Sequence, residues 1–247
     1  GTNVPRVFLG THADRIEENS VIMSNIAANI AAVQERLANA LQRAGRRHDD
    51  ARLLAVSKTF PADAVQEAYA AGLRCFGENR VQELCDKAPK LPADCEWHLI
   101  GHLQQNKVRP ALEHARWLHA VDSVALAQRI QRLAGDLSVA PTLLLEVNIS
   151  GEESKFGLAP DAVEAVLTAL QGGPGCCRGL MTVAPLHASE RELHAVFAGL
   201  RTLRDQLVAR TGMALPELSM GMSGDMEIAV AEGATIVRIG TAIFGRR

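Results

Sequence analysis

The sequence has few aromatic residues, no clear excess of one charge, no long apolar run and no paired cysteine motif. Aromatic residues make up 4% of the 247 residues, and Tyr69 is the single tyrosine. Lys and Arg number 26 against 28 Asp and Glu. A nucleic-acid surface usually needs a strong basic excess, so we expect no nucleic-acid partner. No apolar run approaches the roughly 18 residues that suggest a membrane span, so we expect no membrane partner.

The cysteine content argues against a disulfide framework. The count is odd, no CxxC pair occurs, and two of the cysteines are adjacent, which is a poor geometry for an ordinary disulfide. The five are Cys75, Cys85, Cys95, Cys176 and Cys177. This usage is typical of reduced thiols in a cytoplasmic protein, which is the location that we expect. We also expect a monomer.

The first 22 residues differ from the rest of the chain. They mix Pro, Gly, Asn and charged residues without a period, and they contain no long apolar segment of the kind found in secretory signals. We interpret residues 1–22 as a disordered leader or upstream extension, with translation starting at Met23. The domain prediction is therefore a leader at 1–22 and a folded unit at 23–247.

Apolar spacing predicts alternating helices and strands from Ser24 onward. Ser24 is a plausible N-cap of a first helix, with Gly45 as its stop. Eight short apolar runs follow, typical of buried strands, with helical patterns between them. The runs lie at 53–56, 73–76, 97–100, 117–121, 142–149, 179–183, 217–220 and 236–239, and the clearest helical patterns at 62–71, 123–133, 160–170, 190–209 and 224–232.

This alternation predicts an α/β protein with parallel strands. Eight strand–helix units close naturally into a single (β/α)₈ TIM-type barrel, whose usual length of roughly 250 residues matches this chain. The helix from Ser24 would be an extra N-terminal helix. A doubly wound open sheet is the alternative, because sequence alone does not establish closure.

Lys58 follows the first apolar run, at the end of the barrel where active sites of this fold lie. Burial lowers the pKa of a lysine and makes its neutral amine available to attack a carbonyl. The alternative is a lysine that reaches solvent at the barrel rim or pairs with Glu146.

Small and hydroxyl residues follow the last two strands. Ser223 and Gly224 precede a helical pattern, and Gly240 and Thr241 follow the eighth run. Barrel phosphate sites are frequently built from these two loops. Each feature could be only a cap or a turn, but together with Lys58 they indicate a phosphorylated carbonyl compound as ligand.

Arg238 lies in the apolar context of the eighth strand. An arginine that points into a barrel needs a partner. The candidates are a ring nitrogen of a bound cofactor, Glu146 or Asp225.

Six ordered motifs resemble the pyridoxal phosphate homeostasis protein family, from about Met23 to the C-terminus. They are AVSKT at 55–59, FGENRVQE at 76–83, WHLIGHLQQNK at 97–107, GLM at 179–181, LSMGMS at 218–223 and VRIGTAIFG at 237–245. The resemblance implies a barrel similar to the N-terminal domain of alanine racemase, with pyridoxal 5′-phosphate as cofactor.

The resemblance also implies roles for single residues. Lys58 would carry the cofactor as a Schiff base, and Arg238 would face the pyridine nitrogen. Ser223, Gly240 and Thr241 would bind the phosphate, and Asn79 and Met220 would lie beside the ring. The implied function is homeostasis of pyridoxal phosphate, as a carrier or regulator, with apo forms of pyridoxal phosphate enzymes as recipients.

The main alternative is a pyridoxal phosphate-dependent amino-acid enzyme such as a racemase. Alanine racemase-like enzymes use a tyrosine from a second domain, whereas here few residues follow Thr241 and Tyr69 falls in a helix predicted to face away from the rim. An arginine at the pyridine nitrogen would also disfavour its protonation and weaken the ring as an electron sink. We therefore predict a carrier without an established catalytic activity. A Schiff-base aldolase acting on a sugar phosphate is a third possibility.

Two further patterns support weaker hypotheses. His98 and His102 are four residues apart, but no third ligand lies nearby, so we predict no metal site and interpret His98 as a core or pocket histidine. Lys155 follows the fifth run and could supply a second amine, although a solvated loop lysine is the better interpretation.

Overall fold

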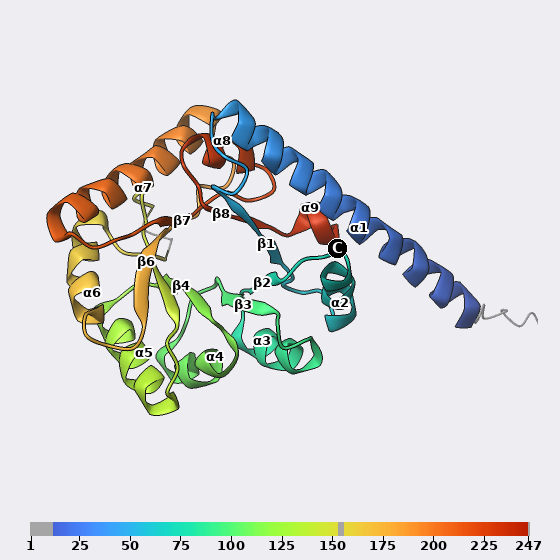
Figure 1. Ribbon diagram of the computed structural model, residues 1–247, viewed down its shortest axis with the longest axis horizontal. Helices are drawn as coiled ribbons and strands as arrows, with labels where there is room; N and C mark the ends of the chain where they lie inside the picture. Colours follow the sequence, from blue (N-terminus) through green and yellow to red (C-terminus); the bar gives the residue numbers. More distant parts are fainter. Residues whose placement is uncertain (1–11, 153–155, 247) are drawn as a thin grey trace, which may run out of the picture.

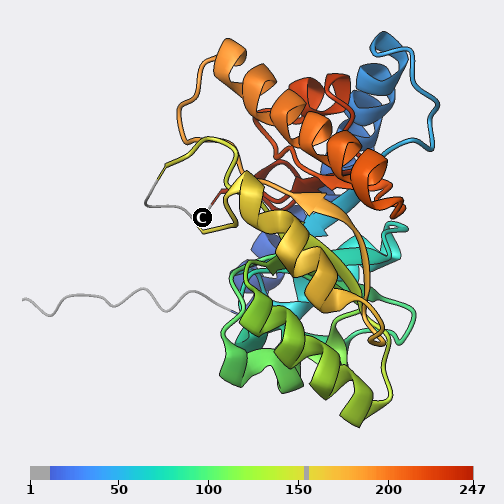
Figure 2. The ribbon, with the colours of Figure 1, turned by 90° about the vertical axis from the view of Figure 1, so that its left-hand side faces the viewer.

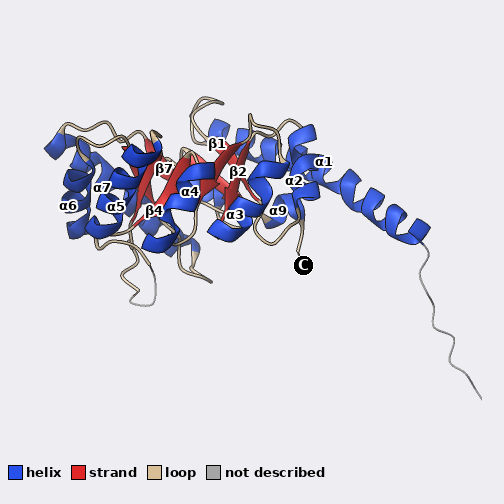
Figure 3. Cartoon of the chain, turned by 90° about the horizontal axis from the view of Figure 1, so that it is seen from below, coloured by secondary structure: helices blue, strands red, loops and turns tan. Residues whose placement is uncertain are grey.

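The computed structural model shows a closed barrel of eight parallel strands in the order β1-β2-β3-β4-β5-β6-β7-β8. It describes residues 12–152 and 156–246, and for residues 12–24 the backbone only. The helices form an outer layer around the strands (Figures 1 and 3). The predicted TIM-type barrel is therefore confirmed, and the open sheet is excluded because β1 pairs with β8.

Each of the eight predicted apolar runs overlaps a strand. The strands are β1 (Arg52–Val56), β2 (Cys75–Glu78), β3 (Glu96–Leu99), β4 (Trp117–Val121), β5 (Thr142–Glu146), β6 (Cys176–Met181), β7 (Glu217–Ser219) and β8 (Ile236–Ile239). The α-helices are α1 (His12–Arg43), α2 (Ala62–Ala70), α3 (Val81–Lys87), α4 (Val108–His114), α5 (Val124–Leu137), α6 (Val163–Leu170), α7 (Glu190–Thr211), α8 (Met226–Ala231) and α9 (Thr241–Phe244). Short 3₁₀ turns are η1 (Ala88–Lys90), η2 (Gln105–Lys107) and η3 (Pro160–Ala162).

The fifth strand ends earlier than its apolar pattern predicts. We expected it to reach residue 149, but β5 stops at Glu146. The side chain of Asn148 accepts a hydrogen bond from the Gly151 N–H at 3.1 Å and turns the chain out of the sheet. A turn formed by one side chain overrides the apolar character of the residues before it.

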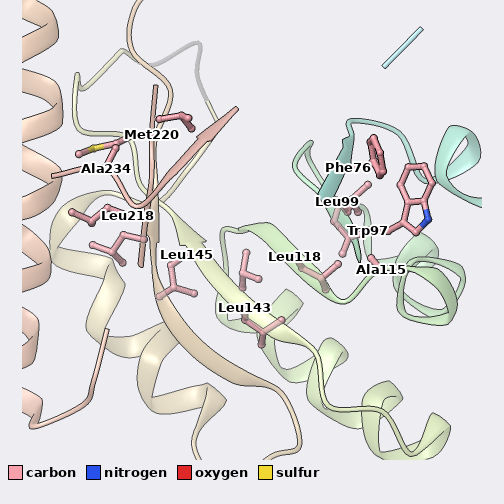
Figure 4. Close-up of a cluster of buried hydrophobic side chains, with 14 of the residues drawn as sticks. Phe76, Trp97, Leu99, Ala115, Leu118, Leu143, Leu145, Leu218, Met220 and Ala234 are labelled. Carbon is pink, nitrogen blue, oxygen red and sulfur yellow. The ribbon is translucent and has the colours of Figure 1, made fainter. Parts of the chain in front are cut away.

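Alternate residues of each strand face two different cores. Residues such as Leu54, Leu144 and Ile236 fill the barrel interior. Their neighbours face outward and pack with the helices in a larger cluster that includes Leu143 and Leu145 (Figure 4). The period of two along each strand therefore decides which side chains can reach a site inside the barrel.

Two helices, α5 and α7, begin at side chains that cap their free N–H groups. Ser123 accepts from the Leu126 N–H at 3.1 Å at the start of α5. Ser189 and Glu192 form a reciprocal capping box at the start of α7, and Gly212 ends that helix in the left-handed conformation. None of the helices within the described ranges is long and apolar enough to cross a bilayer.

The first helix begins before the residue that we expected to cap it. The structure starts α1 at His12, so Ser24 lies inside the helix and is not its N-cap. No Pro or Gly occurs between His12 and Arg43 to interrupt the backbone hydrogen bonds. The structure gives helix at residues 12–22, where we expected disorder. Residues 1–11 lie outside the described residues, and the leader interpretation stays a prediction.

Helix α1 is the predicted extra helix, and it packs along one side of the barrel against α2, α8 and α9 (Figure 1). Arg36 donates to the Ser223 carbonyl at 3.2 Å and pairs with Glu227 at 2.9 Å. Asn29 donates to the Ile243 carbonyl at 2.9 Å. These contacts tie α1 to the two loops in which we predicted the phosphate site.

A pair of glycine substitutions tests the strand packing. A Cβ at Gly179 in β6 would collide with the backbone of Glu217 in β7, whereas a Cβ at Gly135 in α5 would meet nothing within 4 Å. We expect Gly179→Ala to lower the free energy of unfolding by at least about 2 kcal/mol. Gly135→Ala should raise it by about 0.5–1 kcal/mol, because alanine is the better helix former. Urea unfolding measures both, and equal effects of the two substitutions would contradict this packing.

Candidate cofactor-binding site

A cavity of about 510 Å³ opens at the C-terminal ends of the strands. Loops that follow β5 and β6 project from this end of the barrel (Figure 2). The cavity is lined by Val56, Lys58, Asn79, Ile100, Val183, Met222, Ser223, Gly224, Arg238, Gly240 and Thr241. The structure therefore brings all of the predicted site residues except Met220 to one cavity.

Lys58 stands at the cavity edge, directly after β1 and Ser57. Its side chain is exposed, not buried as the sequence argument assumed. Within residues 12–152 and 156–246, no hydrogen bond or ion pair occupies its amine, so it does not pair with Glu146. Lys58 thus lines the cavity with an amine that no described residue binds.

The backbone on both sides of Lys58 is fixed by a buried polar network. Thr59 adopts a left-handed conformation, with φ of 68°, and its N–H donates to Glu83 at 2.7 Å. The Lys87 ammonium donates to the Ser57 carbonyl at 2.8 Å. An unfavourable backbone conformation next to a reactive residue persists only where its surroundings enforce it.

The same network continues beneath the end of β2. Lys87 pairs with Glu78 at 2.7 Å and with Glu83 at 3.0 Å, and the Ser57 hydroxyl donates to Glu78 at 2.5 Å. Glu78 is fully buried, so its charge depends on these partners. We did not expect a role for Lys87 or Glu83 from the sequence. Their spacing of four residues on one helix was the only signal available.

The loops after β7 and β8 meet as predicted. The Ala242 N–H donates to the Ser223 hydroxyl at 3.4 Å, which joins the two loops. A Cβ at Gly240 would lie 3.2 Å from the Val56 carbonyl, and one at Gly224 would meet nothing within 4 Å. Gly240 therefore lets the eighth strand's loop approach β1, and Gly224 leaves open space beside Ser223.

Arg238 is a buried cation with neutral partners. Its side chain lies in the barrel interior and the residue is 5% exposed. The guanidinium donates to the Ser219 hydroxyl at 2.8 Å and to the Thr182 carbonyl at 3.0 Å. No carboxylate of the described residues forms an ion pair with it, although Glu146 and Asp225 influence it over a longer range. Burial lowers the pKa of Arg238 to about 10, so it remains a charged hydrogen-bond donor at neutral pH.

Met220 does not line the cavity, although the resemblance implied that it lies beside the cofactor ring. It is fully buried in the outer core between strands and helices, together with Leu218 and Ala234 (Figure 4). The reason is the alternation of side chains, because Ser219 points inward to Arg238 and Met220 must then point outward. Met222 lines the cavity instead, as do Ile100 and Val183.

Asn79 reaches the cavity because the loop after β2 packs tightly on the loop after β3. A Cβ at Gly101 would collide with the Asn79 carbonyl. Glycine at position 101 therefore permits the close approach that sets the position of Asn79.

The remaining candidates fall outside the cavity. His98 is fully buried and bonded to His119, as expected of a core histidine, whereas His102 bonds to Asp122. Tyr69 bonds to Asp94 near the start of β3, at the opposite end of the barrel. Lys155 lies outside the described residues.

The cavity's donor set fits pyridoxal 5′-phosphate. Lys58 offers an amine to an aldehyde, and Arg238 offers N–H groups to an unprotonated ring nitrogen. Ser223, Gly240 and Thr241 offer hydroxyl and backbone donors to a phosphate. These three groups of donors come from the end of β1, from β8 and from the two final loops, and all of them line one cavity.

Comparison with known proteins places this arrangement in a family. The family model described as alanine racemase, N-terminal domain, matches residues 25–247. The pyridoxal phosphate homeostasis protein of Pseudomonas aeruginosa is 49% identical over 231 residues, covering 91% of this chain and 97% of that protein. The corresponding protein of Aquifex aeolicus is 42% identical, covering 90% and 99%. The chain belongs to the pyridoxal phosphate homeostasis protein family.

Solved structures support the same assignment. PipY of Synechococcus elongatus, solved with PLP bound, superposes with a TM-score of 0.79 at 44% identity, covering 89% of this chain and all of that one. Alanine racemase of Clostridium difficile superposes with a TM-score of 0.71 at 14% identity, covering 91% of this chain and 57% of that one. The second likeness shows a shared fold between the homeostasis family and the racemase.

One acidic group at this end of the barrel titrates near neutral pH. Burial raises the pKa of Glu146, at the end of β5, to about 7, with Asp122 adding to the rise and Arg238 opposing it. The folded protein therefore favours protonated Glu146. Its contribution to stability is present below the ordinary pKa of 4.5 and is lost as the pH rises through about 7.

The substitution Glu146→Gln tests this assignment. We expect it to raise the free energy of unfolding by on the order of 2 kcal/mol at about pH 8.5 and to change it little at about pH 5. Urea unfolding at both pH values measures the difference. Glu35→Gln, which removes an exposed carboxylate of α1, is the control and should show no such pH dependence. An equal effect of Glu146→Gln at both pH values would contradict the raised pKa.

Proposed function

We propose that this protein binds pyridoxal 5′-phosphate through a Schiff base on Lys58 and serves as a carrier that maintains its supply. The observation that carries the proposal is a convergence on one cavity. An amine and a buried arginine, neither of which pairs with a carboxylate in the described part of the chain, meet there with two hydroxyl-bearing loops. Relatives that share 37–49% identity are named pyridoxal phosphate homeostasis proteins. PipY, 44% identical, has been solved with PLP bound.

The residues of the cavity divide the binding between them. Bound pyridoxal phosphate supplies an aldehyde that condenses with amines and a ring that can stabilise negative charge. Arg238 has only donors, so it would accept the ring nitrogen in its unprotonated form. Ser223, Gly240 and Thr241 would hold the phosphate. Asn79 and Met222 lie at the cavity wall, where we propose that they contact the ring.

Two features favour a carrier over a racemase or transaminase. Tyr69 bonds to Asp94 away from the cavity, so it is not placed as a second acid or base. Arg238 disfavours the protonated ring that transamination uses. We propose that the protein acts in the cytoplasm as a monomer and that its recipients are apo forms of pyridoxal phosphate enzymes.

Lys58 can be identified as the attachment point by chemical reduction. We expect borohydride to fix the cofactor on Lys58, as read by peptide mass mapping, and Lys58→Ala to abolish the near-visible absorbance of the loaded protein. Lys90→Ala, which removes an exposed lysine before β3, is the control and should keep both signals. An adduct found only on Lys107 or Lys155, or a ligand without this absorbance, would contradict the assignment.

Thr241 tests the phosphate subsite. A hydrogen bond to a charged group contributes about 1.5–3 kcal/mol, so we expect Thr241→Ala to weaken pyridoxal phosphate binding by about 10–100-fold and pyridoxal binding by less than about threefold. Equilibrium titration of both ligands gives the comparison. Thr168→Ala on α6 is the control. Equal losses for the two ligands would remove Thr241 from the phosphate site.

The carrier role can be separated from catalysis in one assay. The loaded protein is mixed with an apo pyridoxal phosphate enzyme or with D- and L-alanine and other amino acids. We expect cofactor transfer that restores the enzyme, without appreciable amino-acid turnover, because a missing opposing base costs about 10²–10⁴-fold. Saturable turnover that Lys58→Ala abolishes would instead establish an enzyme.

A further inference from the structure

A row of polar side chains crosses the interior of the barrel from its N-terminal end to the cavity. Glu96 bonds to His98 Nε2 at 2.8 Å, and His98 Nδ1 lies 2.8 Å from His119 Nε2. His119 Nδ1 lies 2.9 Å from the Ser219 hydroxyl, which accepts from Arg238 at 2.8 Å. Four strands contribute to the row, namely β3, β4, β7 and β8.

The middle of this row has no access to water. His98, His119 and Ser219 are each 0% exposed. Three hydrogen-bonding side chains in a closed barrel interior must find their partners within the protein. Their partners are one another, with a carboxylate at one end and a guanidinium at the other.

The carboxylate of Glu96 fixes the direction of every hydrogen bond in the row, and Arg238 at the other end is compatible with that direction. Arg238 can only donate, so it donates to the Ser219 oxygen, and the Ser219 hydroxyl can then donate to His119 Nδ1. His119 would carry its proton on Nε2 and donate to His98 Nδ1. His98 would likewise carry its proton on Nε2 and donate to Glu96. Both histidines are neutral in this arrangement, and every donor meets an acceptor.

The opposite direction fails at Glu96. If His98 carried its proton on Nδ1, its Nε2 lone pair would face the carboxylate at 2.8 Å. The pKa of Glu96 is lowered to about 2, chiefly by the hydrogen bond from His98, so the carboxylate stays charged. Only a second proton on His98 would relieve the clash, and burial lowers the pKa of His98 and of His119.

The outer end of the row also resembles a metal-ligand cluster, which we reject. The ligand atoms of Cys75, Glu96 and His98 lie within 4.8 Å of one another. However, Arg52 lies 3.4 Å from Glu96 and 4.4 Å above the Trp117 ring, and Trp117 stacks on His98. A cation already occupies this end, and His98 Nε2 already has a partner, so the cluster serves as the anchor of the row.

We propose that Glu96, His98, His119 and Ser219 are positioning residues, which form a hydrogen-bonded relay of fixed direction that aims Arg238 at the ligand in the cavity. The inference rests on the proposed function only in that Arg238 contacts the cofactor. The relay keeps the Ser219 lone pairs toward Arg238, because the Ser219 hydrogen is committed to His119. Arg238 then keeps its place in the cavity wall without a carboxylate neutralising it.

The direction of the relay can be read without any cofactor. Nitrogen-15 NMR distinguishes the two neutral histidine tautomers and the charged form, and single substitutions of His98 and His119 assign their signals. In the full-length protein near neutral pH, we expect both residues to be neutral and protonated on Nε2. A proton on Nδ1 of either residue, or a charged imidazole, would overturn the relay even if pyridoxal phosphate binds normally.

Matched variants then test the positioning role. Ser219→Ala removes the link between His119 and Arg238. It should weaken pyridoxal phosphate binding by about tenfold, the loss of one hydrogen bond to a charged group. Ser219→Thr keeps a hydroxyl and should bind within about threefold of wild type.

Glu96 variants test the other end of the relay. Glu96→Gln keeps an acceptor, so His98 and His119 should both stay protonated on Nε2. Glu96→Ala removes the acceptor and should yield a mixture of the two neutral tautomers. Glu96 is half-exposed, so its variants remain informative if Ser219→Ala does not fold. Equal binding by the Ser219 variants, or unchanged tautomers in Glu96→Ala, would overturn the proposal. Failure of wild type to bind would instead refute the proposed function and leave the tautomer result standing.

Discussion

The burial of Arg238 at the top of the barrel interior is the constraint on which the site depends. Removing a guanidinium from water is costly, and leaving it without partners is more costly still. In this chain the interior supplies a hydroxyl and a backbone carbonyl rather than a carboxylate. The arginine therefore keeps its charge and keeps donors for a ligand. The other side chains of the interior, including Leu54 and Leu144, are apolar. The polar row is therefore the main source of hydrogen bonds for the arginine inside the barrel.

The rest of the cavity is organised in the same way, by contacts that lie behind the lining residues. Lys87 and Glu78 fix the backbone at Ser57 and leave Lys58 free. Arg36 of α1 holds the carbonyl of Ser223 from outside the barrel. Each ligand-facing group is thus fixed through its backbone or its far side, while the atoms that would meet the ligand remain available. Such an arrangement fits the carrier role that we propose.

The fold and most of the residues that line the cavity could be predicted from the sequence. Apolar runs mark the strands, and the ends of parallel strands converge, so Lys58, Ser223 and Thr241 could be placed together before any geometry was known. The orientation of Met220 could not be predicted, because it depends on which residue of β7 faces inward. The role of His119 was also hidden, since its partners are 21 and 100 residues away in the chain. The start of α1 could not be predicted, because residues 12–22 show no apolar period. No Pro or Gly interrupts them, and the helix extends through them.

Whether Arg238 faces an unprotonated ring nitrogen is tested most directly by the nitrogen-15 chemical shift of that nitrogen in the loaded protein. Pyridoxal phosphate labelled at that nitrogen would be bound to the wild-type chain and recorded near neutral pH. We expect the signal of an unprotonated pyridine nitrogen that accepts a hydrogen bond, because Arg238 can donate but holds its proton at this pH. The signal of a pyridinium nitrogen would contradict it, since a protonated ring could not face Arg238.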